Sequence, residues 1–435
     1  MTLRGPQRAL LPVLAAALLA AGPARAQHSL EMLQESGPQS NRVDLVVLGD
    51  GYTADEQELF AADVDDALEN LLANTPYAEY RPLFNIARID TASAESGADH
   101  PSDDFYVDTW FGCAFDCFGI ERLICCDSGA IFAAAAATYP GYDVLMLLVN
   151  DPEYGGSGGP VAVSSTNAWA LDGPGHEFGH TFAALGDEYE DPYPDFVFSD
   201  IYPNVSPSAD ADLLKWMHWV EDATPLPTPD SAAVDEHHPL GAYEGACYQP
   251  TGLYRPAPLC LMRSLGETLC PVCAEAMVLA FWSGVEPFDS FEPEEPEQAG
   301  VAGDVLEFSV EPVRPEPDTM VVRWLVDGLA IPGAQADILD LEIADLEPGV
   351  HQVTALVEDA TDLVIADDED LLTSSVTWTV TRTDEGTDTD SSGDEGAGGS
   401  GGGGCGCAET GVRTRAGPVG IVSFLTVLPR GKKGG

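Results

Sequence analysis

Basic residues are scarce in this sequence. It holds 18 lysines and arginines against 73 aspartates and glutamates, a formal net charge of −55 at pH 7 over 435 residues. Such a surface repels phosphate groups, so the charge argues against nucleic acid as a partner. A surplus of this kind is typical of a strongly solvated protein surface.

Long apolar runs are also scarce. The N-terminal apolar run, residues 9–21, is too short for an ordinary membrane span. Arg4 and Arg8 precede it, and the small residues of Ala24-Arg25-Ala26 offer a cleavage site. This order is typical of a secretory signal, so we predict a signal peptide over residues 1–26 and a secreted or cell-surface protein.

Cysteines are more numerous, ten in all, and an exported protein meets an oxidising compartment. Two lie near the C-terminus, and an even number lies in the body of the chain: Cys113, Cys117, Cys125, Cys126, Cys247, Cys260, Cys270 and Cys273. We therefore predict that all eight form disulfides. The alternative is that the Cys270-Pro271-Val272-Cys273 pair joins Cys247 and Cys260 in a structural zinc site.

The segment His176-Glu177-Phe178-Gly179-His180 carries the strongest chemical signal. Histidines at i and i+4 fall on one face of a helix, one turn apart, so both imidazoles can bind one zinc ion. The glutamate between them can reach a metal-bound water. The opposite face is apolar and predicts a core contact, while Gly186 suits the end of the helix.

The third zinc ligand is predicted just after this helix. A sharp turn at Gly186 would bring Asp187 back beneath the metal and complete a set of two histidines and one carboxylate. One position would then remain for water. Glu188 is the alternative because its side chain is longer, and otherwise it could orient a histidine. We assign Asp187.

Periodicity predicts an α/β arrangement around this helix. Apolar residues 45–48 and 84–89 read as strands, and the capping box of residues 53–56 opens a helix between them. Such a unit makes the two strands parallel. Residues 142–149 form a buried strand. Residues 161–165 form a short edge strand, able to pair with an extended peptide substrate or to remain a plain sheet edge.

The chain is long enough for two or three domains. We predict a catalytic domain over residues 27–285 and a linker rich in glutamate and proline over residues 286–300. Short β-rich runs over residues 301–382 predict an immunoglobulin-like β-sandwich. Residues 383–404, rich in Asp, Ser, Thr and Gly, predict a flexible linker. A tail follows over residues 405–435, and its weak apolar stretch is too short for a membrane span.

Several motifs lie in order along residues 42–283: Gly49-Asp50-Gly51-Tyr52-Thr53, Val149-Asn150-Asp151, Tyr154-Gly155-Gly156-Ser157-Gly158-Gly159, the His176–His180 segment through Tyr189, Lys215-Trp216 with Trp219, and Cys260-Leu261-Met262-Arg263 with the Cys-Pro-Val-Cys pair. Together they resemble the IgA-peptidase family of secreted bacterial zinc metallopeptidases. The resemblance implies a zinc-dependent endopeptidase with a metzincin-like catalytic domain. It does not imply cleavage of immunoglobulin, because relatives share chemistry more readily than substrate.

The sequence departs from the general metzincin pattern. That pattern places Gly three residues, and His or Asp six residues, beyond the second histidine. Here Ala183 and Gly186 hold those positions, and Asp187 comes one residue later. Met262 suits the methionine-bearing turn beneath the zinc, with an ordinary core methionine as the alternative. The tail resembles the C-terminal sorting signals of myxobacterial surface proteins, which implies attachment to the outer membrane or cell surface.

The sequence thus predicts an α/β (α+β) zincin with a metzincin-like catalytic domain, followed by an all-β immunoglobulin-like sandwich. The expected activity is that of a secreted zinc endopeptidase acting on a protein or peptide substrate. Zn²⁺ would be the cofactor, His176, His180 and Asp187 its ligands, and Glu177 the general base.

Two other functions stay open. One is a surface adhesion protein with a vestigial or structural zinc site. A closed structural site requires a fourth protein ligand, and the candidates in sequence are His218, His237 and His238. The other is a zinc amidase acting on cell-wall amides, which would have a deep, blocked cleft.

Overall fold

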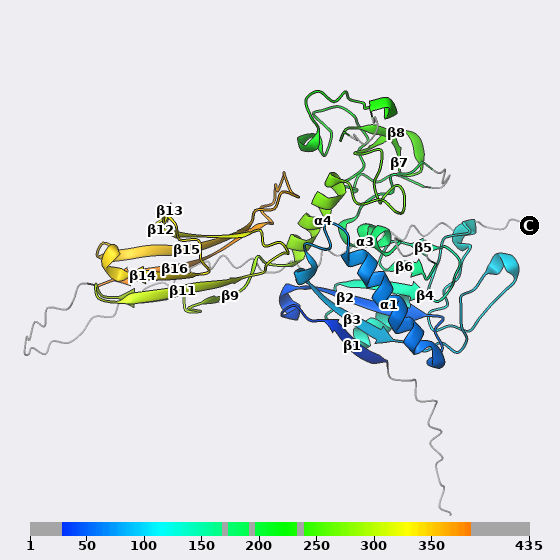
Figure 1. Cartoon of the computed structure of the whole chain (residues 1–435), viewed down its shortest axis with the longest axis horizontal. Helices are drawn as coiled ribbons and strands as arrows, with labels where there is room; N and C mark the ends of the chain where they lie inside the picture. The colour runs from blue at the N-terminus through cyan, green and yellow to red at the C-terminus, as the bar shows by residue number, and fades with distance from the viewer. Residues whose placement is uncertain (1–27, 168–172, 191–195, 233–238, 384–435) are drawn as a thin grey trace, which may run out of the picture.

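The computed structural model describes residues 28–167, 173–190, 196–232 and 239–383. The fold combines helices with several sheets, and Figure 1 shows an α/β part and an elongated β part that extends away from it. The predicted signal peptide, most of the second linker, and the tail lie outside the described residues. No helix within the described ranges has the length and apolar character that a membrane span requires.

The α/β part is built on a six-stranded sheet with the order β1-β3-β2-β4-β6-β5. Its strands are β1 (Ser29–Gln34), β2 (Val43–Asp50), β3 (Phe84–Asp90), β4 (Val144–Val149), β5 (Gly156–Ser157) and β6 (Ala162–Ser165). The four inner strands are parallel, and β1 and β5 run antiparallel at the two edges. Every residue of β2 and β4 is buried, which requires cover on both faces of the sheet.

Helices supply that cover. They are α1 (Gln57–Leu72), α2 (Ser128–Thr138), α3 (Gly173–Ala183) and α4 (Pro271–Gly284). Side chains alternate along β2, so Leu45 and Val47 join the core of α1, α3 and α4, while Val46 and Leu48 join that of α2. The helix α1 begins after the predicted capping box and links the parallel strands β2 and β3, which confirms that unit.

The prediction that residues 161–165 form an edge strand is wrong. β6 lies between β4 and β5, with Ser164 opposite Gly156. The outer side of β5 is also occupied, because Gly156 N–H donates to Arg122 O (3.1 Å) and Ile124 N–H donates to Gly156 O (3.4 Å). Two residues of a glycine-rich turn have no periodicity, so sequence reasoning missed β5. A peptide cannot pair with β6 in this arrangement.

The segment that covers β5 is cross-linked by the disulfides Cys113–Cys126 and Cys117–Cys125. The buried carboxylate of Asp50 accepts hydrogen bonds from Phe111 N–H (2.8 Å) and Cys113 N–H (3.0 Å), so the Gly-Asp-Gly motif anchors this segment. Gly51 has φ +75°, and a Cβ there would lie 2.1 Å from Gly97 O, so no other residue fits.

The prediction of eight disulfide-bonded cysteines is correct for only these four. The remaining body cysteines, Cys247, Cys260, Cys270 and Cys273, are buried and unbonded. The compartment argument favoured disulfides for all of them, but sequence alone could not show which sulfurs come together.

The C-terminal part consists of a five-stranded and a three-stranded sheet, ordered β10-β16-β15-β12-β13 and β14-β11-β9. The strands are β9 (Phe288–Glu292), β10 (Glu297–Gly300), β11 (Val305–Pro312), β12 (Met320–Val326), β13 (Leu329–Ala330), β14 (Ile338–Glu342), β15 (Gly349–Asp359) and β16 (Thr373–Arg382). Phe308 of one sheet meets Trp378 of the other at 4.9 Å between ring centroids, so the sheets pack face to face. Residues 286–300 were predicted as a linker; instead they form β9 and β10.

The two parts of the chain share buried polar contacts. Asp359 of β15 accepts hydrogen bonds from the Tyr80 hydroxyl (2.6 Å) and from Trp282 Nε1–H (2.8 Å) of α4. Glu275, also on α4, accepts from Ile365 N–H (2.7 Å). The last helix of the α/β part is therefore bonded directly to the β part. The remaining hairpin is β7 (Tyr243–Ala246) with β8 (Gln249–Arg255), and the turn between its strands bonds to the segment that follows α3.

Candidate active site

The helix α3 holds the central residues of the site. Phe178 is fully buried and packs edge-on against Tyr77, with 5.7 Å between ring centroids, as the apolar face predicted. Met262 lies directly against the helix, because a Cβ on Gly179 would come within 3.0 Å of its sulfur. The helix is thus fixed from two sides.

Both histidines are oriented by backbone carbonyls. His176 Nδ1 lies 3.0 Å from Leu261 O, and His180 Nδ1 lies 2.6 Å from Leu185 O. A carbonyl only accepts, so each Nδ1 carries a proton, and each Nε2 presents a lone pair when its ring is neutral. The two Nε2 atoms are 3.0 Å apart. This is the tautomer that a shared metal ion requires.

Asp187 joins the histidines after a tight helix end. The helix stops at Ala183 and Ala184 takes φ +51°, earlier than the predicted stop at Gly186. Leu185 N–H then bonds back to Gly179 O (3.1 Å), which closes the end. Gly186 is required for close packing instead, because a Cβ there would lie 2.9 Å from the Tyr202 ring.

The geometry of this cluster fits one zinc ion. Asp187 Oδ1 lies 3.2 Å from His176 Nε2 and 3.3 Å from His180 Nε2. Tetrahedral bonds of the usual Zn–N and Zn–O length give ligand separations of ~3.3 Å. The Oδ1 atom is buried and has no hydrogen-bond donor among the described residues. A cation would satisfy it.

The charges of the cluster lead to the same expectation. Burial lowers the pKa of His180, but the carboxylate of Asp187 outweighs this and raises it to about 9. Burial likewise opposes the charge of Asp187, yet the two histidines hold its pKa well below the ordinary value. Without metal, the cluster therefore takes up a proton at neutral pH, and a bound metal ion would displace that proton.

Glu177 faces the glycine-rich turn. A Cβ on Gly156 would lie 3.1 Å from Glu177 Oε1, and one on Gly158 would lie 3.0 Å from Oε2, so only glycines leave room above the carboxylate. Burial raises the pKa of Glu177, and the nearby histidines only partly offset this. A raised carboxyl pKa is typical of a group that exchanges protons during catalysis.

A cleft of about 200 Å³ opens over the cluster, and its wall includes Glu177, Tyr154, Tyr189 and two arginines. The guanidinium of Arg122 stacks over the Tyr189 ring at 5.7 Å and donates to its hydroxyl (3.2 Å). Arg263 donates to Glu188 O (3.1 Å). No motif pointed to Arg122, which the disulfide-linked segment brings here.

Tyr248 is a further residue that sequence reasoning missed. Its hydroxyl donates to Asp187 Oδ2. Cys247 and Tyr248 both have positive φ, 46° and 64°, which non-glycine residues rarely adopt. Backbone bonds from Cys247 N–H to Asp187 O (2.8 Å) and from Tyr248 N–H to Tyr189 O (3.0 Å) hold this turn.

The other candidate ligands lie elsewhere. Glu188 joins a cluster of three cysteines and not the histidines. His218 Nε2 lies 2.7 Å from Glu275 Oε2, next to the β part. His237 and His238 lie outside the described residues. The structure therefore brings His176, His180 and Asp187 together, and Glu177 lies beside them.

Comparison with known proteins identifies the family. A family model described as IgA Peptidase M64 matches residues 31–239. Residues 31–239 therefore belong to this family. The match takes in α3 and Asp187, and it ends before Met262 and the last four body cysteines.

Other comparisons add little about this family member. No curated protein matches the chain. Among solved structures, a quinonprotein alcohol dehydrogenase-like protein from Bacteroides thetaiotaomicron shares 16% identity over 22% of this chain, with a TM-score of 0.15. The match spans only 18% of that protein's length, and a TM-score this low does not indicate a shared fold.

Proposed function

We propose that this chain is a secreted zinc-dependent endopeptidase. The observation that carries the proposal is the convergence of two Nε2 atoms and one carboxylate oxygen beside Glu177, under a cleft, in a chain of a peptidase family. Export by residues 1–26, surface attachment by residues 405–435 and an immunoglobulin-like character of the C-terminal sheets are parts of the same proposal.

The residues divide the chemistry between them. His176, His180 and Asp187 would hold the zinc ion. When bound, zinc supplies Lewis acidity that polarises the scissile carbonyl and makes water more acidic. Glu177 removes a proton from the attacking water and delivers it to the leaving amine. Its raised pKa suits both steps, since the group must accept and then release a proton.

The remaining residues orient the site. The hydroxyl of Tyr248 binds Asp187 Oδ2 and so leaves Oδ1 directed at the histidines. Arg122 lies in the wall of the cleft beside Glu177, where its guanidinium can bind a substrate carbonyl oxygen.

The number of ligands in the histidine cluster distinguishes an enzyme from the adhesion alternative. A structural zinc site uses four protein ligands, whereas a catalytic site leaves one position to water or substrate. Within the described part of the chain, the histidine cluster has three ligands, and His176 also lines the cleft. This favours catalysis over a purely structural or vestigial site.

The zinc amidase remains the second candidate. Strand β6 is covered by β5, and Gly156 of β5 is itself bonded to Arg122 and Ile124. An extended peptide therefore lacks the predicted pairing strand, which is a specific observation in favour of a smaller amide substrate.

One experiment separates these functions. The purified exported chain is offered a peptide library and, separately, cell-wall fragments, before and after removal and restoration of zinc. An endopeptidase cleaves internal peptide bonds, loses activity with the metal and regains it with zinc. Cleavage of cell-wall amides alone would select the amidase. Zinc-replete protein without hydrolysis of either substrate would support the adhesion alternative.

A further inference from the structure

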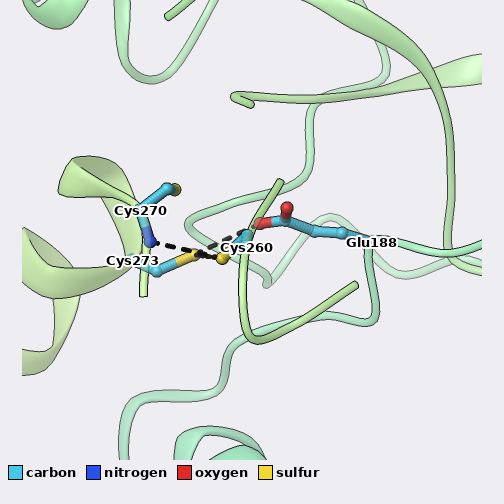
Figure 2. Close-up of side chains that lie close together, drawn as sticks. All are labelled: Glu188, Cys260, Cys270 and Cys273. Carbon is cyan, nitrogen blue, oxygen red and sulfur yellow. Dashed lines mark hydrogen bonds between the residues drawn. The ribbon is translucent and has the colours of Figure 1, made fainter. Parts of the chain in front are cut away.

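A second group of metal-binding side chains lies immediately beyond the candidate active site. It consists of Glu188, Cys260, Cys270 and Cys273, whose ligand atoms all lie within 4.8 Å of one another. We propose that these four residues bind a second zinc ion in a closed, structural site. Figure 2 shows the carboxylate and the sulfurs of Cys260 and Cys273 directed toward one another.

Three different elements contribute these ligands. Glu188 directly follows Asp187, and Cys260 precedes the Met262 turn. Cys270 is the N-cap of α4, and Cys273 lies in the first turn of that helix. The N-terminus of a helix favours thiolates, so this placement suits two metal-bound sulfurs. All four residues are buried, with at most 5% of any residue exposed.

Two of the separations within the group match those of tetrahedral ligands. The sulfurs of Cys260 and Cys273 are 3.7 Å apart, and Cys273 Sγ lies 3.2 Å from Glu188 Oε1. Tetrahedral zinc with bonds of ordinary length separates two sulfurs by ~3.8 Å and a sulfur from an oxygen by ~3.5 Å. Cys270 N–H also donates to Cys260 Sγ (3.3 Å), an interaction that stabilises a thiolate.

The carboxylate of Glu188 lacks a counter-charge in this group. Its Oε1 accepts a hydrogen bond from Asn204 Nδ2–H (2.9 Å). Its Oε2 is buried and has no hydrogen-bond partner among the described residues. A buried carboxylate beside three sulfurs is unfavourable unless a cation or a proton neutralises it. A zinc ion supplies the positive charge for all four ligands at once.

A disulfide would explain fewer of these four side chains than a zinc ion does. Three cysteines can form one disulfide, which leaves the third sulfur outside the bond and the buried Oε2 atom of Glu188 without a partner among the described residues. Sulfur ligands also exclude the hard cations Ca²⁺ and Mg²⁺, and four protein ligands without an open position are typical of structural zinc. Cys247, the fourth buried cysteine, is not part of the group, so Glu188 takes the position that Cys247 held in the alternative drawn from the sequence.

The closed site positions the ligands of the other metal. Leu261 O, one residue after Cys260, accepts from His176 Nδ1–H. Met262 O accepts from Glu188 N–H (2.8 Å), next to Asp187. A metal bound to Cys260 and Glu188 therefore fixes the loop that orients His176 and the backbone that carries Asp187.

Metal counting on the zinc-loaded full chain tests the site. The Glu177→Gln variant serves as host, because it removes self-cleavage while leaving every proposed ligand intact. We expect two zinc ions per chain. The double variant His176→Ala/His180→Ala should retain one, and Cys273→Ser should lose one. Cys247→Ser is the matched control, since it changes a buried thiol outside the group, and it should retain both ions.

A second measurement does not depend on the folding of a cysteine variant. In the unsubstituted chain, a chelator should make Cys260, Cys270 and Cys273 more reactive toward alkylation, whereas the reactivity of Cys247, which is buried outside the group, should not change. Cobalt loading of the His176→Ala/His180→Ala variant should give thiolate-to-metal charge-transfer absorption. One zinc per chain that disappears with the two histidines, or a disulfide within the group, would overturn the proposal.

This test is separate from that of the proposed function. Two zinc ions in a chain that hydrolyses nothing would leave the closed site standing and contradict the endopeptidase. Zinc-dependent hydrolysis with a single ion held by the histidines would support the proposed function and contradict the closed site.

Discussion

Asp187 and Glu188 are neighbours in the chain, yet they belong to two clusters with different chemistry. Asp187 lies with two histidine nitrogens in a group of three ligands under a cleft. Glu188 lies with three sulfurs in a group of four buried ligands. Three ligands and an open side suit catalysis, whereas four buried ligands suit structure. The two proposals therefore give adjacent carboxylates different tasks.

The two clusters are also connected. The loop of Cys260, Leu261 and Met262 reaches both, since it supplies a sulfur to one cluster and a carbonyl to His176 of the other. Damage to the closed cluster should therefore weaken the open one, whereas loss of the open cluster should leave the closed one intact. The predictions below test this asymmetry.

Asp187→Ala should have the largest effect on the open cluster. The change removes the only carboxylate ligand and leaves two histidines. We expect severe loss of the zinc ion of the histidine cluster and of hydrolysis. The zinc ion of the closed cluster should be retained. Zinc content after dialysis against a mild chelator measures this. An unchanged content would show that Asp187 is not a ligand.

Glu188→Ala should instead act on the closed cluster. It removes one of four ligands in a buried group, so we expect loss of one zinc ion and a lower midpoint of thermal unfolding. Hydrolysis should fall less than in Asp187→Ala, because the histidine cluster keeps its three ligands. Complete loss of hydrolysis with an unchanged unfolding midpoint would instead place Glu188 in the open site.

Tyr248→Phe should have a moderate effect. It removes the hydroxyl that binds Asp187 Oδ2 and keeps the ring. Partners of metal ligands typically contribute about 10- to 100-fold to metal affinity or activity. Competition with a zinc-binding dye measures the affinity, and Tyr202→Phe, outside both metal groups, serves as control. Equal affinities in the two variants would contradict an orienting role for Tyr248.

The smallest effect is expected at His100, which belongs to neither cluster. Burial lowers its pKa, but Asp151, 2.8 Å from Nε2, and Glu153 outweigh this and raise it above 6.5. A raised pKa stabilises the fold below the unfolded-state value, and this stability is lost as pH rises through the folded-state pKa. His100→Gln should therefore lower the free energy of unfolding, measured by urea titration, more at pH 6 than at pH 8.5, by roughly 1 kcal/mol or less.

The sequence predicted the parts of the fold that rest on periodicity. Residues 45–48 and 142–149 are apolar throughout or nearly so, and both form central buried strands. The short strand β5 and the strands within residues 286–300 have no such pattern. Their pairing depends on contacts with distant segments, which is why they were missed.

The candidate site was predictable where the ligands lie within a few residues. His176, Glu177 and His180 share a helix face, and Asp187 follows one tight turn. Tyr248, by contrast, reaches the site through a strained turn 61 residues beyond Asp187. The presence of Glu188 rather than Cys247 beside the three cysteines likewise depends on tertiary packing, which residue spacing does not encode.

The most direct test of the proposed activity compares the unsubstituted chain with Glu177→Gln at equal zinc content. Both proteins are incubated with an unfolded protein substrate, and new amino termini are counted over time. The proposal predicts zinc-dependent cleavage by the unsubstituted chain and loss of most of it in Glu177→Gln, because only the base has changed. Equal rates in the two zinc-loaded proteins would contradict it.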